Sequence, residues 1–286
     1  MQAVTLGFKA YDAHELACHF VARHAGLYER RGLRVRLVDT TFVPDAELPP
    51  CTFQAACAAA LTGWLGGADM RVVFVAADRP MFWLHAGAGL RLTDLEGRRV
   101  AGYPAPAPPA LMFREILRGR GVDPNSVVLQ PARDDIARLG LLADGSVDAA
   151  LVSSAVSPRS KTIRGAGEVL CFGDEIRVPA TGLAVSATTA DTESGLVTAM
   201  CVCYREALEL IHAGTGVLEA ALSAFVTPAA ADTGALAERV RHCYTRDGTS
   251  SSATLDAAAS LMARAMHATD LRPVDSLYDF SALDAI

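Results

Sequence analysis

Hydrophobic and polar positions alternate most clearly in the central stretch of the chain, residues 93–154. Short apolar runs, typical of buried strands, are separated there by amphipathic segments with the helical period. The pattern predicts strands at 100–102, 127–130 and 147–152, and helices at 110–120 and 134–143. Gly121, with Pro124 shortly after it, is a typical end for the first of these helices. Strands that alternate with helices of about ten residues predict parallel pairing through crossovers, and therefore an α/β fold.

The same alternation continues on both sides of this stretch. It predicts strands at 3–8, 34–39, 71–76, 81–86, 168–172 and 180–186, helices at 13–30 and 52–65, and a helical C-terminal part at about 191–212, 215–226, 233–246 and 253–268. Asp12 is a plausible N-cap for the helix at 13–30. In a parallel sheet, ligands bind beyond the carboxyl ends of the strands. The loops that follow the strands are therefore the expected binding region.

Three runs carry a resemblance to a known family: DLEGRRVAGYP from residue 94, ALMFREILRGRGVDPNSVVLQ from residue 110 and LLADGSVDAALVSS from residue 141. Together they resemble the second lobe of the substrate-binding proteins of ABC importers for nitrate, sulfonate, taurine and thiamine-pyrimidine precursors. FVARHAGLYERRGLRVRLVD, from residue 20, resembles the first helix and second strand of that family. PATGLAVSATTADTESGLVTAMCVCYREALELI, from residue 179, resembles its return strand and long helix. The likeness covers most of the chain.

The resemblance implies an α/β, two-lobed, type II periplasmic-binding-protein-like fold with an interlobe cleft and C-terminal helices. Lobe one would consist of residues 1–88 and 180–286, and lobe two of residues 89–179. The first hinge crossing would lie at Gly87–Gly89 and the second at 173–178. Such lobes close on a small ligand by hinge rotation. The implied partners are a small molecule and, for an exported protein, an ABC permease; no cofactor and no metal are expected.

Composition narrows the classes of partner and compartment. A net charge of −6 and a pI near 5.6 argue against nucleic acid, whose binders concentrate positive charge. No run reaches the roughly 18 apolar residues that a membrane span needs. The start MQAVTLGFKAYDAHE has neither the basic nor the apolar region of a leader. The expectation is a cytoplasmic protein as written, or a periplasmic or extracellular one if a leader was removed.

Candidate ligand-binding residues are polar or aromatic side chains of the strand-end loops. They are Lys9, Tyr11, Thr40, Thr41, Cys51, Thr52, Asp78, Arg79, Tyr103, Ser153 and Ser154. Tyr11 and Tyr103 could hold a planar ring between the lobes. Lys9, Arg79 and backbone amides could neutralise an anion, whereas Asp78 and Arg79 fit a ligand clamp or a solvated turn equally well. The expected function is that of a solute-binding-protein-like module for a sulfonate, a carboxylate, or a pyrimidine or aromatic compound.

The alternative is a cytoplasmic enzyme on the same scaffold that acts on a small aromatic or heterocyclic substrate. The resemblance allows it, because aromatic-sulfinate desulfinases and pyrimidine synthases share this fold. Cys51 is the candidate nucleophile, since it would begin the helix predicted at 52–65, where amide groups stabilise a thiolate. A small residue covering the helix start is the competing interpretation. His14, one helical turn before Cys18, is the second catalytic candidate, although its spacing also suits the flank of an ordinary helix.

Overall fold

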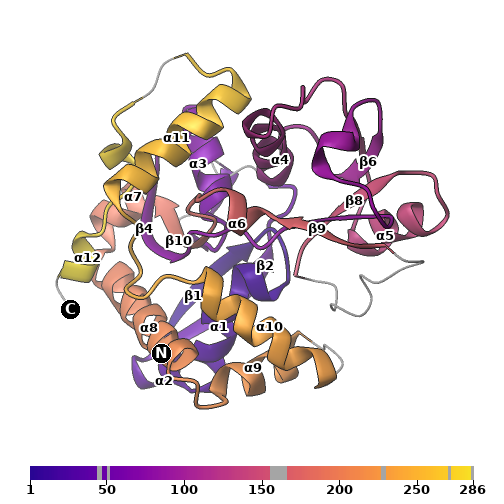
Figure 1. Cartoon of the computed structure of the whole chain (residues 1–286). Helices are drawn as coiled ribbons and strands as arrows, with labels where there is room; N and C mark the ends of the chain where they lie inside the picture. The colour runs from indigo at the N-terminus through magenta and orange to yellow at the C-terminus, as the bar shows by residue number, and fades with distance from the viewer. Residues whose placement is uncertain (44–46, 50–51, 155–165, 227–229, 270–271, 285–286) are drawn as a thin grey trace.

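A computed structural model describes residues 1–43, 47–49, 52–154, 166–226, 230–269 and 272–284, and within them the strands form two mixed sheets (Figure 1). The first sheet has the order β2 (Leu33–Asp39), β1 (Gln2–Phe8), β3 (Thr52–Gln54), β10 (Thr181–Ser186), β4 (Met70–Ala77). The second has the order β7 (Val128–Pro131), β6 (Arg99–Gly102), β8 (Ala149–Val152), β5 (Trp83–Ala86), β9 (Gly167–Cys171). In each sheet, four strands run in the same direction and one runs antiparallel to them: β10, between β3 and β4, in the first sheet and β5, between β8 and β9, in the second.

Helices flank both sheets. They are α1 (Ala13–His24), α2 (Leu27–Arg30), α3 (Cys57–Leu65), α4 (Pro108–Gly119), α5 (Asp135–Ala143), α6 (Phe172–Glu175), α7 (Ala187–Thr192), α8 (Ser194–His212), α9 (Val217–Phe225), α10 (Ala230–Cys243), α11 (Ser252–Met266) and α12 (Ser281–Asp284), with 3₁₀ turns η2 (Leu92–Leu95) and η3 (Val274–Ser276). α1 packs on α8 and α9 beside the first sheet, and α4 of the second lobe packs on α11. None of the described helices is long and apolar enough to cross a membrane.

Two buried clusters hold these layers together. One surrounds α1, α8 and the first sheet and contains Phe20, Phe74 and Tyr204. The other contains Trp64 of α3 and Phe113 of α4, and it extends across the contact between α4 and α11. Each such side chain contributes about 1.5–3 kcal/mol when it leaves water. The second cluster therefore couples the lobes by packing, in addition to the chain crossings.

The chain crosses from the first sheet to the second between β4 and β5, and returns between β9 and β10. The crossing segments are hydrogen-bonded to each other: the Val178 amide donates to the Asp78 carbonyl at 2.9 Å, and the Ala180 amide donates to the Ala77 carbonyl at 2.8 Å. β5 belongs to the second sheet, where it pairs with β8 and β9. All four residues of β5 are buried, a pattern that fits a central strand of either sheet. The lobe boundary predicted at residue 88 therefore places β5 in the wrong lobe. The crossing lies before β5 rather than at Gly87–Gly89.

Two predicted helices differ from the structure. The helix predicted at 13–30 is interrupted, because Gly26 takes a left-handed conformation with φ of 67° between α1 and α2. The helix predicted at 52–65 is wrong over its first residues. Thr52–Gln54 form β3, buried between β1 and β10, and α3 begins only at Cys57. Cys51 itself lies outside the described residues, and the residues that follow it form a strand rather than a helix start.

Candidate functional site

A group of buried polar side chains lies where the N-terminal end of α1 meets the second sheet. This interlobe polar cluster consists of Asp12, Glu15, Asp135, Arg138, Ser153 and Ser154, each less than 10% exposed. The first two residues follow β1, and the other four lie in α5 after β7 or directly after β8. The cluster therefore occupies the carboxyl ends of parallel strands from both sheets, where α/β proteins bind ligands.

On the first lobe, two carboxylates organise the loop between β1 and α1. Asp12 caps α1, since its backbone is extended and its Oδ1 accepts a hydrogen bond from the Glu15 amide at 2.9 Å. Glu15 accepts from the amides of Lys9 at 2.6 Å and Ala10 at 2.9 Å, one with each carboxylate oxygen. The backbone amides of this loop are thus bound by side-chain carboxylates of the same lobe.

On the second lobe, Asp135 connects α5 to the end of β8. Its Oδ2 accepts from the Ser153 amide at 2.9 Å and from the Ser153 hydroxyl at 2.7 Å, and its Oδ1 pairs with Arg138. Arg138 also donates from Nε to the Gly102 carbonyl at 3.2 Å. Its guanidinium carbon lies 3.7 Å from the ring centre of Tyr103. Arg138 is thus neutralised, hydrogen-bonded and covered by an aromatic ring.

His14 connects the two lobes. Its amide donates to Ser154 Oγ at 2.8 Å, and its Nε2 accepts from the Met81 amide at 3.3 Å in the first crossing segment. Its ring packs edge-on against Phe82 with centroids 5.1 Å apart. Burial lowers the pKa of His14 to about 3, so the imidazole stays neutral. A neutral ring that accepts a backbone amide positions the crossing segment and is a poor general base.

Burial disfavours negative charge on the first-lobe carboxyls. It raises the pKa of Asp12 to about 6; the charge of Asp135 adds to the shift, and the Glu15 amide and the hydroxyls of Ser153 and Ser154 oppose it. Burial, and next the charge of Asp12, raise the pKa of Glu15 to about 8 against the opposing amides of Lys9 and Ala10. Among the described residues, Asp12 Oδ2 has no hydrogen-bond partner. The cluster therefore holds an excess of acceptors in a buried place.

Asp12→Asn should make stability less sensitive to pH. The folded-state pKa of Asp12, about 6, lies above its ordinary value of 3.8, so the stability that its proton provides is complete below about pH 4 and is lost as pH rises through 6. Asparagine retains the capping oxygen without the charge. At pH 8 the variant should be more stable by about 2–3 kcal/mol in urea unfolding, at 1.36 kcal/mol for each pKa unit, and the gain should disappear near pH 4.

Asp134→Asn is the matched control for this change. Asp134 caps α5 with nearly the same backbone angles, and its Oδ1 accepts from the Ala137 amide at 2.8 Å. Its side chain is 43% exposed, and its pKa is lowered, first by that amide hydrogen bond. Its replacement should bring no gain at pH 8. If the free energy of unfolding had the same pH dependence in wild type and Asp12→Asn, the raised pKa assigned to Asp12 would be wrong.

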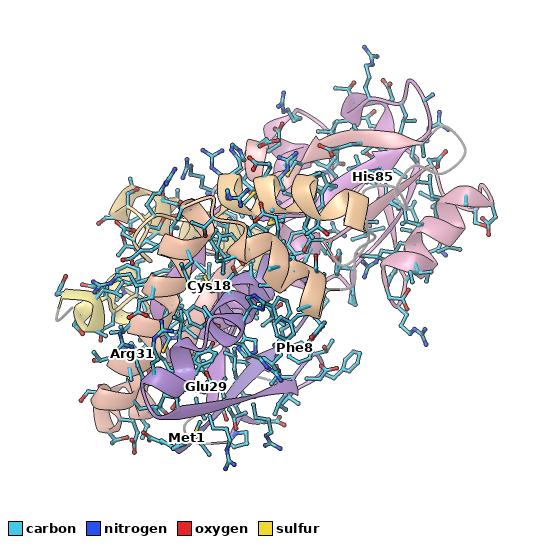
Figure 2. All side chains as sticks on the ribbon, turned by 90° about the horizontal axis from the view of Figure 1, so that it is seen from below. Met1, Phe8, Cys18, Glu29, Arg31 and His85 are labelled. Carbon is cyan, nitrogen blue, oxygen red and sulfur yellow. The ribbon has the colours of Figure 1, made fainter. Side chains whose placement is uncertain are left out.

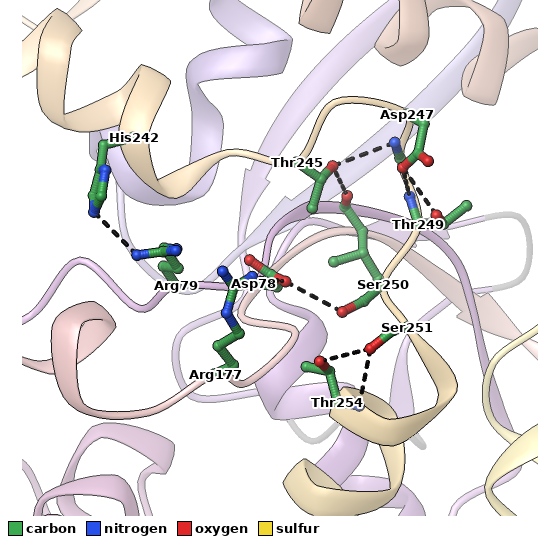
Figure 3. Close-up of polar contacts among 12 residues, drawn as sticks. Asp78, Arg79, Arg177, His242, Thr245, Asp247, Thr249, Ser250, Ser251 and Thr254 are labelled. Atoms are coloured by element: carbon green, nitrogen blue, oxygen red, sulfur yellow. Dashed lines mark hydrogen bonds and ion pairs between the residues drawn. The ribbon is translucent and has the colours of Figure 1, made fainter.

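Asp78 and Arg79 hold the hinge (Figure 3). Asp78 Oδ2 accepts from Arg177 Nη1 at 2.9 Å and from Ser250 Oγ at 3.2 Å, which joins both crossing segments to the connection between α10 and α11. Arg79 Nη1 lies 3.1 Å from His242 Nε2 on α10. Both residues thus have partners within the protein, and the ligand clamp considered from the sequence has no support in this arrangement.

Other predicted site residues stabilise the loops of the first lobe. Lys9 donates from Nζ to the carbonyls of Thr40 at 2.8 Å and Val43 at 2.6 Å. Thr40 Oγ1 donates to the Phe8 carbonyl at 3.0 Å, and Thr41 Oγ1 donates to the Lys9 carbonyl at 2.9 Å. Thr52 is buried in β3. These contacts hold the Lys9 ammonium group at the end of β1, where its charge still acts on Glu15 of the interlobe polar cluster.

The two tyrosines lie differently from the expected sandwich. Tyr11 is 47% exposed and packs on Phe8 and Phe20 of its own lobe. Tyr103 packs against Phe82, with centroids 5.6 Å apart, and it also contacts the guanidinium of Arg138.

Of the predicted residues, Ser153 and Ser154 belong to the interlobe polar cluster, Tyr103 borders it, and His14 adjoins it. The sequence reasoning missed Glu15, Asp135 and Arg138 and took Asp12 only as a helix cap. The Asp-x-x-Glu spacing at 12 and 15 was the available signal.

The described cysteines are buried free thiols: Cys18, Cys57, Cys171, Cys201, Cys203 and Cys243. Burial raises the pKa of Cys201 to about 12 and that of Cys203 to about 11. Cys18, the neighbour of His14 in α1, also has a raised pKa because of burial. Across the described ranges, no group of three or more His, Cys, Asp or Glu side chains is arranged to hold a metal ion.

Two cavities lie apart from the cluster. One, of about 760 Å³, is lined by 86–93, Arg120, 167–170 and Glu175 on the second lobe. The other, of about 330 Å³, lies between Ile176, Arg177 and α11. Figure 2 shows the second lobe, marked by His85, extending away from the first, which carries Phe8 and Cys18. The interlobe polar cluster is packed shut between these lobes, so a ligand has to enter it by separating them.

No protein-family model and no curated protein matches the chain. Solved structures do: a Bordetella bronchiseptica protein (TM-score 0.78, 14% identity, 100% of this chain and 96% of that one) and the aliphatic sulphonate binding protein SsuA of Escherichia coli (0.76, 14%, 94% of each chain). The desulfurization enzyme DszB is also similar (0.68, 14%, 100% of this chain and 98% of that one). At these identities the likeness concerns the fold. It confirms the prediction: the chain has the two-lobed, type II periplasmic-binding-protein fold.

Proposed function

We propose that this protein reversibly binds a small organic molecule between its two lobes, at the interlobe polar cluster. The observation that carries the proposal is the position of the cluster. Asp12 on one lobe, with Glu15 beside it, lies close to Asp135, Ser153 and Ser154 on the other, all buried and all beyond the carboxyl ends of strands. Buried polar groups cost free energy unless they are hydrogen-bonded, and Asp12 Oδ2 has no such partner among the described residues, as expected of a group that binds a ligand.

The hinge supplies the motion that binding requires. Two short crossing segments connect the sheets, and they are hydrogen-bonded to each other near Asp78 and Val178. Rotation about such a pair opens the cleft against the packing of α4 on α11, which also joins the lobes. The amide of His14 and the hydroxyl of Ser154 then separate, and the interlobe polar cluster becomes accessible to a ligand.

Comparison with solved structures agrees with a binding role. The similar proteins include SsuA, named for the binding of aliphatic sulphonates, and the ligand binding component of an ABC-type import system from Staphylococcus aureus. For this chain, a sulfonate, a carboxylate, or a pyrimidine or aromatic ligand follows from the resemblance. A permease partner and a periplasmic or extracellular location belong to the proposal for an exported protein.

The geometry gives less support to catalysis. Of the two catalytic candidates, Cys51 lies outside the described residues, and His14 is a neutral, amide-bound ring with a pKa of about 3. The described cysteines are buried. DszB shares the fold, but among the described cysteines Cys57, Cys201 and Cys203 donate to backbone carbonyls in the core. Binding is therefore the function that we propose.

Ligand binding should raise the thermal stability of the protein, and Ser154→Ala should lower the affinity for the ligand. A ligand at a hundred times its dissociation constant stabilises the folded state by about 2.7 kcal/mol, which a thermal-shift screen of organic anions, cations and neutral aromatics would detect. Ser154→Ala leaves the His14 amide unpaired when the lobes close, which costs about 1–3 kcal/mol and weakens binding by about 5- to 150-fold.

Ser126→Ala provides the control for that variant. Ser126 lies in the loop after α4, where its hydroxyl donates to the Asp123 carbonyl at 2.7 Å, so its loss should leave affinity unchanged. Equal affinities for wild type and Ser154→Ala would show that the ligand does not bind at the closed lobe contact.

A further inference from the structure

Four backbone amides around the start of α1 already donate to side chains of the protein. The amide of Lys9 and that of Ala10 donate to Glu15, the Glu15 amide donates to Asp12, and the His14 amide donates to Ser154. An anion bound at the start of a helix needs such amides. Here side chains of the protein occupy them, and most of those side chains are carboxylates. The N-terminal end of α1 already holds negative charge.

The cationic side chains nearby also have partners within the protein. Arg138 pairs with Asp135, donates to the Gly102 carbonyl and lies against Tyr103. Lys9 directs its ammonium group to the carbonyls of Thr40 and Val43. A sulfonate or carboxylate ligand would have to displace one of these partners to gain a counter-charge. Neither Arg138 nor Lys9 is therefore preorganised to bind an anion at this site.

An acceptor remains. Asp12 is 1% exposed, and within the described part of the chain its Oδ2 has no partner within hydrogen-bond distance. The carboxyl lies close to the second lobe, because the charge of Asp135 raises its pKa and the hydroxyls of Ser153 and Ser154 lower it. Asp135 is paired with Arg138, and Glu15, with a pKa of about 8, is mostly protonated at neutral pH, so Asp12 is the carboxylate of the cluster that lacks a counter-ion. A buried carboxylate oxygen without a counter-ion is complementary to a positively charged donor.

We propose that the ligand of the interlobe polar cluster is a small organic cation, a protonated amine or amidine whose N–H groups bind Asp12 Oδ2, and that the site disfavours sulfonates and carboxylates. This inference rests on the proposed binding function and adds the charge class of the ligand. The aromatic rings of Phe82 and Tyr103, 5.6 Å apart, border the same place and suit the flat or apolar part of such a base.

A series of compounds with one ring and different charge tests the assignment by isothermal titration calorimetry. The probes are benzamidine and phenethylamine as cations, benzamide as the neutral analogue, and benzenesulfonate and benzoate as anions. The cations should bind wild type at least about tenfold more tightly than benzamide or the anions, because a charge-assisted hydrogen bond is roughly twice as strong as a neutral one. Asp12→Asn should lose at least about tenfold in affinity for the cations. Asp134→Asn, which changes the matched cap of α5, should lose nothing.

Proton release gives a second readout in the unaltered protein. A bound cation favours the ionised form of Asp12, so benzamidine binding near pH 6 should release protons. The measured heat should then depend on the ionisation enthalpy of the buffer, and this dependence should fall in Asp12→Asn. Proton uptake, or none at all, would overturn the role given to Asp12 even if the variant folded poorly.

The outcomes separate the charge class from the binding function. If benzenesulfonate or benzoate binds and Ser154→Ala weakens it, the cation assignment is overturned while binding at the lobe contact stands. If the cations bind equally well to Asp12→Asn, their assignment to Asp12 is overturned. If no member of the series binds wild type, both the cation assignment and the proposed function fail.

Discussion

Asp135→Ala is expected to lower the free energy of unfolding by about 3–5 kcal/mol, the usual cost of breaking a buried ion pair from one side. The change leaves the Arg138 guanidinium, 4% exposed, without its carboxylate, and it removes the acceptor of the Ser153 amide and hydroxyl. Of the Arg138 contacts described above, those with the Gly102 carbonyl and the Tyr103 ring remain in this variant. Urea unfolding at pH 7 measures the loss.

The neighbouring Asp134→Ala supplies the comparison for this variant. It removes the cap of the same helix, α5, and should cost about 1 kcal/mol. The two changes differ in whether a buried cation loses its partner. Equal losses for Asp134→Ala and Asp135→Ala would show that Asp135 acts through helix capping alone, and that the second-lobe half of the interlobe polar cluster is not a coupled unit.

Gly182→Ala should lower stability more than the addition of a methyl group at any other glycine of the first sheet. Gly182 lies in β10 with φ of 157°, at a break in the pairing with β4. A Cβ there would lie 2.0 Å from the carbonyl oxygen of Phe74, which is backbone and cannot turn away. β10 would have to leave β4, where the return crossing enters the sheet. We expect a loss of about 4 kcal/mol or more, or failure to fold at 37 °C.

Gly195→Ala is the control for the added methyl group. Gly195 lies near the start of α8, and a Cβ on it meets nothing within 4 Å. The change should be neutral, or stabilising by up to about 1 kcal/mol, because alanine favours helix. A similar mild effect of Gly182→Ala in thermal unfolding would contradict the close approach of β10 to β4.

The sequence predicted the architecture well because its elements carry local signals. Strand runs, the end of α4 at Gly121 and the cap at Asp12 each depend on a few neighbouring residues. The segment after Cys51 was misread because a continuous apolar run has no period that separates strand from helix. Thr52–Gln54 become a strand since β1 and β10 offer pairing on both sides, which no local pattern encodes.

The candidate site was only partly predictable for a similar reason. Asp12 and Glu15 are fully explained locally as a helix cap and a loop brace. They come near Asp135, which lies more than a hundred residues later in the sequence, only because the two lobes close on each other. Asp78 and Arg79 were chosen correctly as residues at the end of a strand, but this strand leads into the hinge rather than the cleft. Position after a strand indicates the right edge of a sheet, and closure decides which residues meet.

Hydrogen exchange measured by mass spectrometry, with and without the tightest-binding compound of the charge series, tests the central claim most directly. Binding at the interlobe polar cluster should slow exchange in both lobes at once: in the peptide that carries the amides of Lys9, Ala10 and His14, and in the peptide that carries the amide of Ser153. Protection confined to one lobe, such as the segment 86–93 beside the larger cavity, would contradict the account.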